Sequence, residues 1–247
     1  MTNEYYKPGE QRAVRVGQLF ATIARRYDLI NDIQSFGIHR RWKKRVVGLT
    51  RIEPGEQALD LCCGTGDLTL ALAEKGAHVT GLDFSEPMLE VARKKAARFD
   101  ATGGAKLSSA NIQFIQGDAQ QIPFPENSVD VLTIGYGLRN LSDLDAGLRD
   151  MLRVTKPGGR FVALEFGKPA NAAWRAIYFG YLKFTLPVFG KVFCGNSAAY
   201  AYILESLSHY PAQQGVAEKL TQVGWRNVRI INLIGGVMSI HYAEKPR

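Results

Sequence analysis

Cysteine and histidine are scarce in this chain of 247 residues, which contains three cysteines and four histidines. No C-x-x-C pair occurs, and Cys62 and Cys63 are neighbours in an apolar run, where successive side chains of a strand point to opposite faces. Structural zinc sites need several such ligands at short, defined spacings. The sequence therefore predicts no metal site, and Cys62, Cys63 and Cys194 are expected to behave as small core residues.

Long apolar runs are also absent. The N-terminus, MTNEYYKPGEQRAVRV, lacks the hydrophobic region of a secretory signal, and no uninterrupted apolar run reaches the roughly 18 residues of a membrane span. The composition, with 46% hydrophobic and 22% charged residues, is ordinary for a soluble globular protein. We therefore expect a cytoplasmic enzyme that forms a single domain over residues 1–247.

Positive charge is in excess, with a formal net charge of +8. Five of the six residues from Arg40 to Arg45 are cationic, and Trp42 is the sixth. Such a run is usually a solvated helix face, but a basic surface also attracts nucleic acid or an anionic membrane. A more specific hypothesis than a solvated face is that helix 40–45 docks on anionic lipid headgroups, helped by Trp42. This contact would place the protein at the inner face of the cell membrane.

The most informative stretch is QALDLCCGTGD, residues 57–67. An apolar run ends at Gly64-Thr65-Gly66, and a helical pattern begins near Asp67, which predicts a strand, a tight glycine turn and a helix. Glycines let the backbone approach a ligand closely, and the start of the helix offers unpaired N–H groups. Two glycines alone are a weak signal, because they also occur in ordinary turns between a strand and a helix.

The acids around this turn suggest the ligand. A second strand, residues 78–82, ends at Asp83, where a carboxylate can accept both hydroxyls of a ribose. Thr69 occupies the last glycine position of the dinucleotide pattern, so a nicotinamide cofactor is disfavoured. Asp60, just before the turn, would repel an anion and suits a ligand with an ammonium group. A nucleoside that carries an ammonium group points to S-adenosylmethionine, and the stretch resembles motif I of class I methyltransferases, with Cys62 in place of its first glycine.

The rest of the chain alternates between strands and helices. Further strands are expected at residues 112–115, 129–136, 160–166, 226–233 and 239–244. Helices are expected at residues 14–33, 67–75, 86–99, 144–154 and 216–223, and the basic run 40–45 is expected to open another helix that extends to about residue 49. This order predicts a doubly wound α/β fold with helices on both faces of the sheet. With the motif I resemblance, it implies the class I methyltransferase (Rossmann-like) type: a seven-stranded, mostly parallel sheet. Residues 1–50 are expected to form an N-terminal helical cap. The aromatic residues 168–215 are expected to form a helical insertion: a lid, a membrane-contacting surface or plain core.

Ligands of such sheets bind beyond the carboxyl ends of the strands. Asp118 follows the third strand, where an acid can accept from the amine of adenine. Arg139 and Asn140 follow the fourth strand and are therefore candidates for catalysis or substrate orientation. Glu165, in the fifth strand, comes to the same edge.

Two long motifs resemble a specific family. Residues 27–42, YDLINDIQSFGIHRRW, look like the N-terminal signature of the ubiquinone/menaquinone biosynthesis C-methyltransferases, with Ile30 where methionine is typical. Residues 153–161, RVTKPGGRF, resemble the second signature. Together with GLRN at 137–140 and LEF at 164–166, the likeness extends from about Val16 to Tyr242.

The resemblance implies S-adenosylmethionine-dependent C-methylation of a prenylated, lipid-soluble quinol ring, first of all demethylmenaquinol to menaquinol. It also assigns cofactor positions to Thr65, Asp83, Asp118, Ala119 and Gly135, beside Asp60, Gly64 and Gly66 of the turn. The alternative substrates are a ubiquinone-type benzoquinol and a phylloquinone precursor. The second is considered because, at the Cys62-Cys63 pair, the sequence looks more like photosynthetic naphthoquinone methyltransferases than like the bacterial enzymes, in which Ala-Gly is common. A nucleic-acid methyltransferase is less favoured, since Gly135-Tyr136-Gly137 is not its usual motif, and a non-catalytic scaffold is disfavoured because the cofactor residues are present.

The expected chemistry needs a proton acceptor for a ring hydroxyl and a group that stabilises the resulting phenolate. Arg139 with Asn140 could hold the phenolate or an activated water, and His39 is the alternative base. Arginine stays protonated, so electrostatic stabilisation is its more natural role. Whether the chain forms a homo-oligomer is left open.

Overall fold

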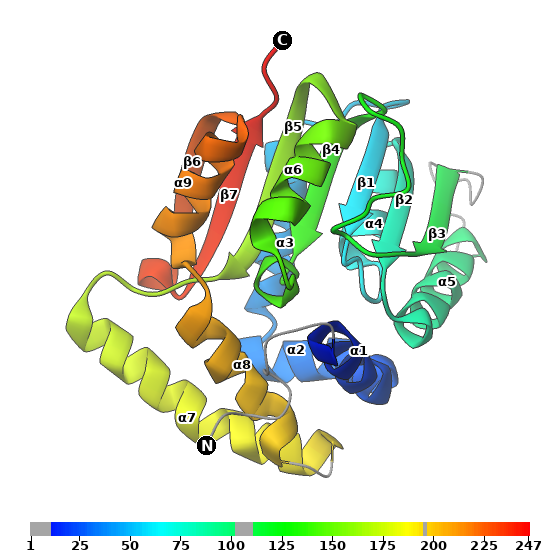
Figure 1. The fold of residues 1–247 in the computed structure, drawn as a ribbon. Helices are drawn as coiled ribbons and strands as arrows, with labels where there is room; N and C mark the ends of the chain where they lie inside the picture. The colour runs from blue at the N-terminus through cyan, green and yellow to red at the C-terminus, as the bar shows by residue number, and fades with distance from the viewer. Residues whose placement is uncertain (1–10, 102–110, 195–196) are drawn as a thin grey trace.

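A computed structural model describes residues 11–101, 111–194 and 197–247, and it is built around a seven-stranded sheet (Figure 1). The strand order is β3-β2-β1-β4-β5-β7-β6, and β7 alone runs antiparallel to its neighbours β5 and β6. The strands are β1 (Gln57–Leu61), β2 (His78–Asp83), β3 (Ile112–Gln116), β4 (Val129–Gly135), β5 (Thr155–Phe166), β6 (Arg226–Leu233) and β7 (Met238–Glu244). The predicted fold class, a seven-stranded and mostly parallel sheet with flanking helices, is confirmed, and the chain ends in an antiparallel pair of strands.

Helices cover both faces of this sheet (Figure 1). On one face lie α3 (Ile38–Thr50) and α4 (Asp67–Ala73), and on the other α6 (Leu144–Val154) and α9 (Ala212–Val223), while α5 (Glu86–Ala101) lies beside β3. The alternation of side chains along the strands supplies a core to each face. In β5, Phe161 and Ala163 join the core under α6 and α9, whereas Val162 and Leu164 join the core under α3 and α4.

A third apolar cluster lies beyond the sheet and joins segments far apart in the sequence. It brings α1 (Gln11–Ile23) and α2 (Tyr27–Ser35) together with α7 (Ala172–Cys194) and α8 (Ser197–His209) (Figure 1). Leu19 and Ile30 from the N-terminal helices pack with Tyr178, Leu182 and Leu207 from the insertion. We call these four helices the cap. The α3 helix, in contrast, packs on the sheet through Val46 and Val47.

Three predicted boundaries were wrong. The helix expected over residues 14–33 is interrupted by a 3-10 turn, η2 (Ala24–Arg26), which lets α1 and α2 take different directions. The strand expected at 160–166 already begins at Thr155, because Thr155 pairs with Val129 before a register shift. The helix expected from residue 216 begins at Ala212, directly after Pro211.

The first ten residues of the N-terminal stretch discussed above and residues 102–110, between the helix expected at 86–99 and the strand expected at 112–115, lie outside the described residues. Among the helices that the structure does describe, none is long and apolar enough to cross a membrane.

Candidate functional site

The candidate site lies at the carboxyl ends of the parallel strands, beneath the cap. There the β1–α4 turn takes the conformation that its glycines predict, with φ of 56° at Gly64 and 83° at Gly66. Cys62 has φ of 50°, a left-handed conformation that favours glycine, so the chain places a cysteine in a strained position at this turn. Gly66 also packs closely, since a Cβ there would lie 3.2 Å from Ala92 and Phe114.

One cavity, which we call the edge cavity, opens along the ends of β1, β2 and β4. The predicted cofactor residues that line it are Gly64, Asp83, Asp118, Ala119 and Gly135. Its opposite wall comes from the cap, through Val16, Gly17, Phe20 and Tyr27. The structure therefore brings these five predicted residues together and encloses them with helices from the N-terminus.

The two carboxylates of the edge cavity are fixed by backbone N–H groups. Asp83 accepts hydrogen bonds from Gly64 N at 2.8 Å and Ser85 N at 2.9 Å, and burial raises the pKa of its carboxyl. Asp118 accepts from Gln120 N at 2.8 Å. Each acid therefore has a set orientation and retains lone pairs for a ligand's hydroxyl or amino group.

A smaller polar recess adjoins the edge cavity around Asp60, with Thr65, Gly64 and Gly135 in its lining. Asp60 is 1% exposed and accepts from Thr69 Oγ1 at 2.7 Å and Thr133 Oγ1 at 2.8 Å. Burial raises the pKa of Asp60 to about 6, against the opposing effect of these hydroxyls. Because a carboxylate accepts up to about four hydrogen bonds, Asp60 can still receive an ammonium group.

An ionic network ties the cap to the glycine turn. Thr65 Oγ1 donates to Asp28 Oδ1 of α2 at 2.6 Å, and Lys95 of α5 pairs with both Asp28 and Asp67. Lys43 of α3 reaches the same Asp67 at 2.7 Å. Four helices thus converge on the turn, and the hydroxyl of Thr65 is directed to the cap.

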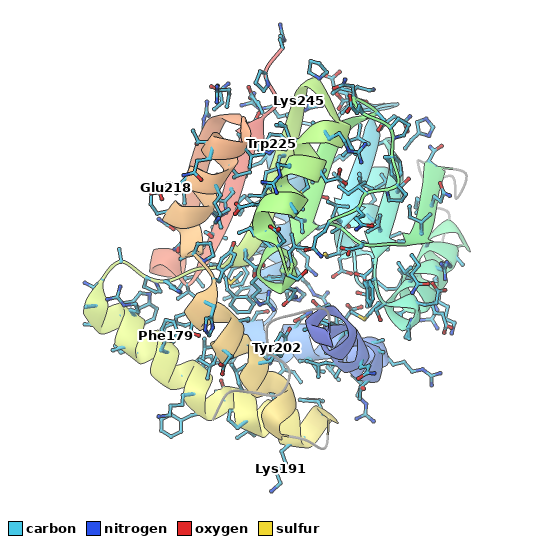
Figure 2. The ribbon with its side chains drawn as sticks, in the orientation of Figure 1. Phe179, Lys191, Tyr202, Glu218, Trp225 and Lys245 are labelled. Atoms are coloured by element: carbon cyan, nitrogen blue, oxygen red, sulfur yellow. The ribbon has the colours of Figure 1, made fainter. Side chains whose placement is uncertain are left out.

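A second cavity, the cap cavity, lies among α1, α2, α3, α7 and α8. Its lining is mainly apolar and aromatic, with Leu19, Ile23, Tyr178, Leu182, Leu186 and Val237 among its walls. Three residues, Phe20, Tyr27 and Tyr136, line both this cavity and the edge cavity. We call them the shared wall. In Figure 2, Tyr202 lies between α8 and α1, and its ring meets Phe20 edge-on at 6.4 Å.

Arg139 reaches the cap cavity from the 3-10 turn η4 (Leu138–Asn140). Its Nη1 lies 2.7 Å from Glu165 Oε1 and 2.6 Å from the carbonyl oxygen of Tyr136, and its guanidinium stacks 4.7 Å from the Phe166 ring centre. Arg139 and Glu165 are both buried. The Glu165 charge raises the pKa of Arg139 despite the burial, so the guanidinium stays charged.

Asn140 lines the edge cavity, although it is the next residue in the chain. Its Nδ2 donates to the same Tyr136 carbonyl oxygen at 3.3 Å, and its Oδ1 is buried with no hydrogen-bond partner in the described chain. The pair that the sequence analysis treats as one unit is therefore divided by the shared wall, with one side chain in each cavity.

His39, the other candidate, lines the cap cavity from the first turn of α3. Its Nε2 lies 2.8 Å from Asp32 Oδ1. Hydrogen bonds from Arg40 and His39 lower the pKa of Asp32 to about 2, so this carboxylate is ionised and can only accept. The proton of neutral His39 is therefore on Nε2, which leaves Nδ1 as a lone-pair acceptor. Burial lowers the pKa of His39, so the neutral form predominates at pH 7.

The basic helix differs from the expectation. Trp42 does not face outward but lines the cap cavity and packs against the sheet core, because α3 lies along the sheet. Lys43, whose side chain is largely buried, forms an ion pair with Asp67, and Arg40 forms an ion pair with Asp32. Arg41, Lys44 and Arg45 are exposed.

Several residues of the site escaped the sequence analysis. Val16, Gly17 and Phe20 of α1 carried no signal beyond the period of an amphipathic helix. Asp28, Asp32 and Lys95 are charged residues whose partners lie on other elements or beyond a helix corner. No group of three or more metal-binding side chains occurs in the stretches that the structure describes.

Comparisons with known proteins agree with this geometry. The model of the ubiE/COQ5 methyltransferase family matches residues 7–245. A demethylmenaquinone methyltransferase from Desulfitobacterium hafniense is 40% identical over 97% of this chain and 93% of its own. One from Staphylococcus aureus is 39% identical over 94% of both. A crystal structure of a SAM dependent methyltransferase from Aquifex aeolicus superimposes with a TM-score of 0.57 at 18% identity, over 82% of this chain and 88% of the other.

The Asp32–His39 pair leads to a spectroscopic prediction. In the wild-type protein we expect His39 to titrate below its ordinary 6.5, as the Nε2–H tautomer. Asp32→Asn removes a carboxylate that raises this pKa, while Lys43 and Asp67, the other charges near the ring, stay in place, so the pKa should fall further. Nitrogen-15 NMR of the imidazoles measures both effects.

His241 is the internal control for this titration. It is buried on β7 and its Nε2 lies 2.9 Å from Gln213 O. Burial lowers its pKa and the bond to Gln213 raises it, and Asp32 does not contribute. Its titration should not respond to Asp32→Asn. A wild-type His39 that titrates at or above 6.5 would contradict the assignment.

Proposed function

Since the chain belongs to the ubiE/COQ5 methyltransferase family, we propose that it methylates a ring carbon of a prenylated quinol, most directly demethylmenaquinol to menaquinol. The fold and the family make it an S-adenosylmethionine-dependent methyltransferase. The demethylmenaquinone methyltransferases of Desulfitobacterium and Staphylococcus, which match nearly the full chain, support the choice of quinol.

The observation that carries the proposal is the pair of adjoining cavities. The edge cavity has oriented carboxylates suited to a nucleoside, and the cap cavity has apolar and aromatic walls suited to a lipophilic ring. They meet at the shared wall of Phe20, Tyr27 and Tyr136. A methyl donor in one and an acceptor ring in the other would meet there, away from bulk water.

The residues present fit S-adenosylmethionine. In this proposal Asp83 binds the ribose hydroxyls, Asp118 and Ala119 bind the adenine, and Asp60 binds the ammonium group, a role that its position in the lining of the polar recess supports. Gly64, Gly135 and the Thr65–Gly66 turn would shape the backbone around it, with Asn140 on the same side. When bound, S-adenosylmethionine supplies an electrophilic methyl group on a sulfonium sulfur.

Arg139 is suited to stabilise the phenolate. Loss of the proton from the ring hydroxyl beside the reacting carbon makes that carbon electron-rich, and its electron pair forms the new bond to the methyl group as the carbon–sulfur bond breaks. The ring carbon then releases its own proton to water and the ring regains its aromaticity as a phenolate, whose oxygen takes back a proton to give the methylated quinol. A fixed guanidinium in an apolar cavity stabilises the negative oxygen more strongly than it would in water.

His39 is suited to accept the hydroxyl proton, directly or through one water. It is neutral at pH 7, its Nε2–H is held by Asp32, and Nδ1 carries the lone pair. An imidazole whose orientation is fixed by a carboxylate is a common form of general base. Arg139 cannot take this part because it keeps its proton.

A methyl-transfer assay with labelled S-adenosylmethionine tests the proposal. We offer a reduced demethylnaphthoquinol and a reduced demethoxybenzoquinol, each with a short prenyl chain, and expect product from the naphthoquinol. Product from the benzoquinol alone would make this a ubiquinone-type enzyme. The proposal would be overturned in favour of a nucleic-acid methyltransferase if the cofactor binds and neither quinol is methylated, but added RNA or DNA becomes labelled.

Arg139→Lys tests the electrostatic role. Lysine retains the charge next to Glu165, which avoids an unpaired buried carboxylate, but it loses the planar guanidinium. We expect kcat to fall about 100-fold, the scale for a lost transition-state donor, while the Kd of S-adenosylmethionine changes less than about threefold. Arg226→Lys, at an exposed position, is the control. Equal losses in kcat and in cofactor affinity would contradict the role.

The surface of α7 supports a further part of the proposal, peripheral contact with an anionic membrane. Ile177, Phe184, Val188 and Val192 form an outward stripe, each at least 60% exposed. Lys183 and Lys191 flank it, and Lys191 projects away from the molecule (Figure 2). Apolar side chains flanked by lysines are typical of helices that lie in a membrane interface. Tyr181 of the same helix is exposed and also lines the cap cavity, so a quinol could enter from the bilayer.

Vesicle sedimentation tests this contact. The double variant Phe184→Asp/Val188→Asp should reduce partitioning onto phosphatidylglycerol-containing vesicles at least about tenfold, because charge replaces two interfacial apolar side chains. Activity on a short-chain quinol in detergent should be unchanged. Gln214→Asp/Gln222→Asp adds the same charge on α9 as the control. Equal vesicle binding by wild type and both variants would exclude α7 as the contact surface.

A further inference from the structure

The cap cavity contains polar atoms whose hydrogen bonds are missing. Gln34 Nε2 and Tyr178 Oη both belong to residues that line the cavity. Each atom is shielded from solvent and has no hydrogen-bond partner in the described chain. Asn31 Nδ2, on the same cavity, is likewise without a partner in the described residues. Buried polar groups are nearly always paired, so such a group of unpaired donors at one apolar cavity calls for an explanation.

Their positions within the cavity differ. Tyr178, on α7, lies within the electrostatic reach of Arg139, whose charge acts on its hydroxyl, while burial raises the pKa of that hydroxyl and keeps it protonated. Gln34 lies seven residues beyond Tyr27 on α2, which corresponds to about 10 Å along the helix axis. Since Tyr27 belongs to the shared wall, Gln34 marks the end of the cavity away from that wall.

We propose that Tyr178 and Gln34 bind the two oxygens of the quinol ring. Tyr178 donates, beside Arg139, to the proximal oxygen, next to the carbon that is methylated. The Gln34 amide donates to the distal oxygen, across the ring. The two donors fix the ring so that one carbon faces the shared wall, and both are positioning residues rather than groups that react. This inference rests on the proposed function for the identity of the ring.

The roles predict a combination of effects that a structural role would not give. Tyr178→Phe and Gln34→Met remove unpaired polar atoms at nearly constant shape, so the melting temperature of the ligand-free protein should stay the same or rise. The Kd of a reduced, short-chain demethylnaphthoquinol should nevertheless rise about 3- to 10-fold, the scale of one hydrogen bond. Trp42 lines the cavity, so quenching of its fluorescence can report binding without turnover.

Tyr210→Phe is the matched control. The Tyr210 hydroxyl is likewise buried without a partner in the described residues, but Tyr210 lies in the core of the sheet and does not line the cap cavity. Its variant should keep both its stability and the quinol affinity of the wild type. The cofactor Kd should be unchanged in all three variants.

A naphthol that lacks the distal hydroxyl separates the two sites. Gln34→Met should weaken binding of the quinol but not of this naphthol, whereas Tyr178→Phe should weaken both. A lower melting temperature with unchanged quinol affinity would assign Gln34 and Tyr178 to structure and overturn the inference. Because binding is measured without methyl transfer, a wild type that binds the quinol but does not methylate it would refute the proposed function and leave the ring-binding result standing.

Discussion

The buried ion pair between Arg139 and Glu165 is the interaction on which the rest of the site depends. Glu165 Oε1 accepts from Arg139 Nη1 and from Phe166 N, and Glu165 Oε2 accepts from Arg139 N, so the carboxylate fixes both the side chain and the backbone of η4. Arg139 in turn holds the carbonyl of Tyr136. Removal of one partner of such a pair typically costs about 3–5 kcal/mol, because the other charge is left buried and unpaired.

This pair also fixes the boundary between the two cavities. Tyr136 has φ of 61°, an unfavourable conformation for an aromatic residue, and its carbonyl receives hydrogen bonds from both Arg139 and Asn140. The backbone strain is thus maintained by contacts on either side of the wall. The result is that two adjacent residues serve different cavities: the guanidinium of Arg139 lines the cap cavity, and the amide of Asn140 lines the edge cavity.

The cap supplies the other half of the site and shows why distant parts of the chain act together. Helices α1 and α2 close the edge cavity, and the same helices join α7 and α8 around the cap cavity. The Asp28–Lys95–Asp67 network anchors this cover to the glycine turn. A single apolar cluster therefore connects the walls of the edge cavity with those of the cap cavity and with α7, whose other face is exposed.

Much of this could be predicted from sequence because the determining patterns are local. The strand–turn–helix at residues 57–67, the acids Asp83 and Asp118, and the presence of the last two strands follow from periodicity and from the rule that ligands bind at strand ends. The break at Ala24–Arg26 could not be predicted, because tertiary packing rather than a glycine or proline redirects the chain. The inward turn of Trp42 and the separation of Arg139 from Asn140 likewise depend on how distant elements pack.

The most direct test of the account is a crystal structure of the protein with S-adenosylhomocysteine and a reduced short-chain demethylnaphthoquinol. We expect the nucleoside in the edge cavity with its ribose on Asp83, the ring in the cap cavity with one oxygen beside Arg139, and the thioether sulfur facing a ring carbon across Tyr27 and Tyr136. A ring bound on the outer surface, or a nucleoside in the cap cavity, would contradict the two-cavity account.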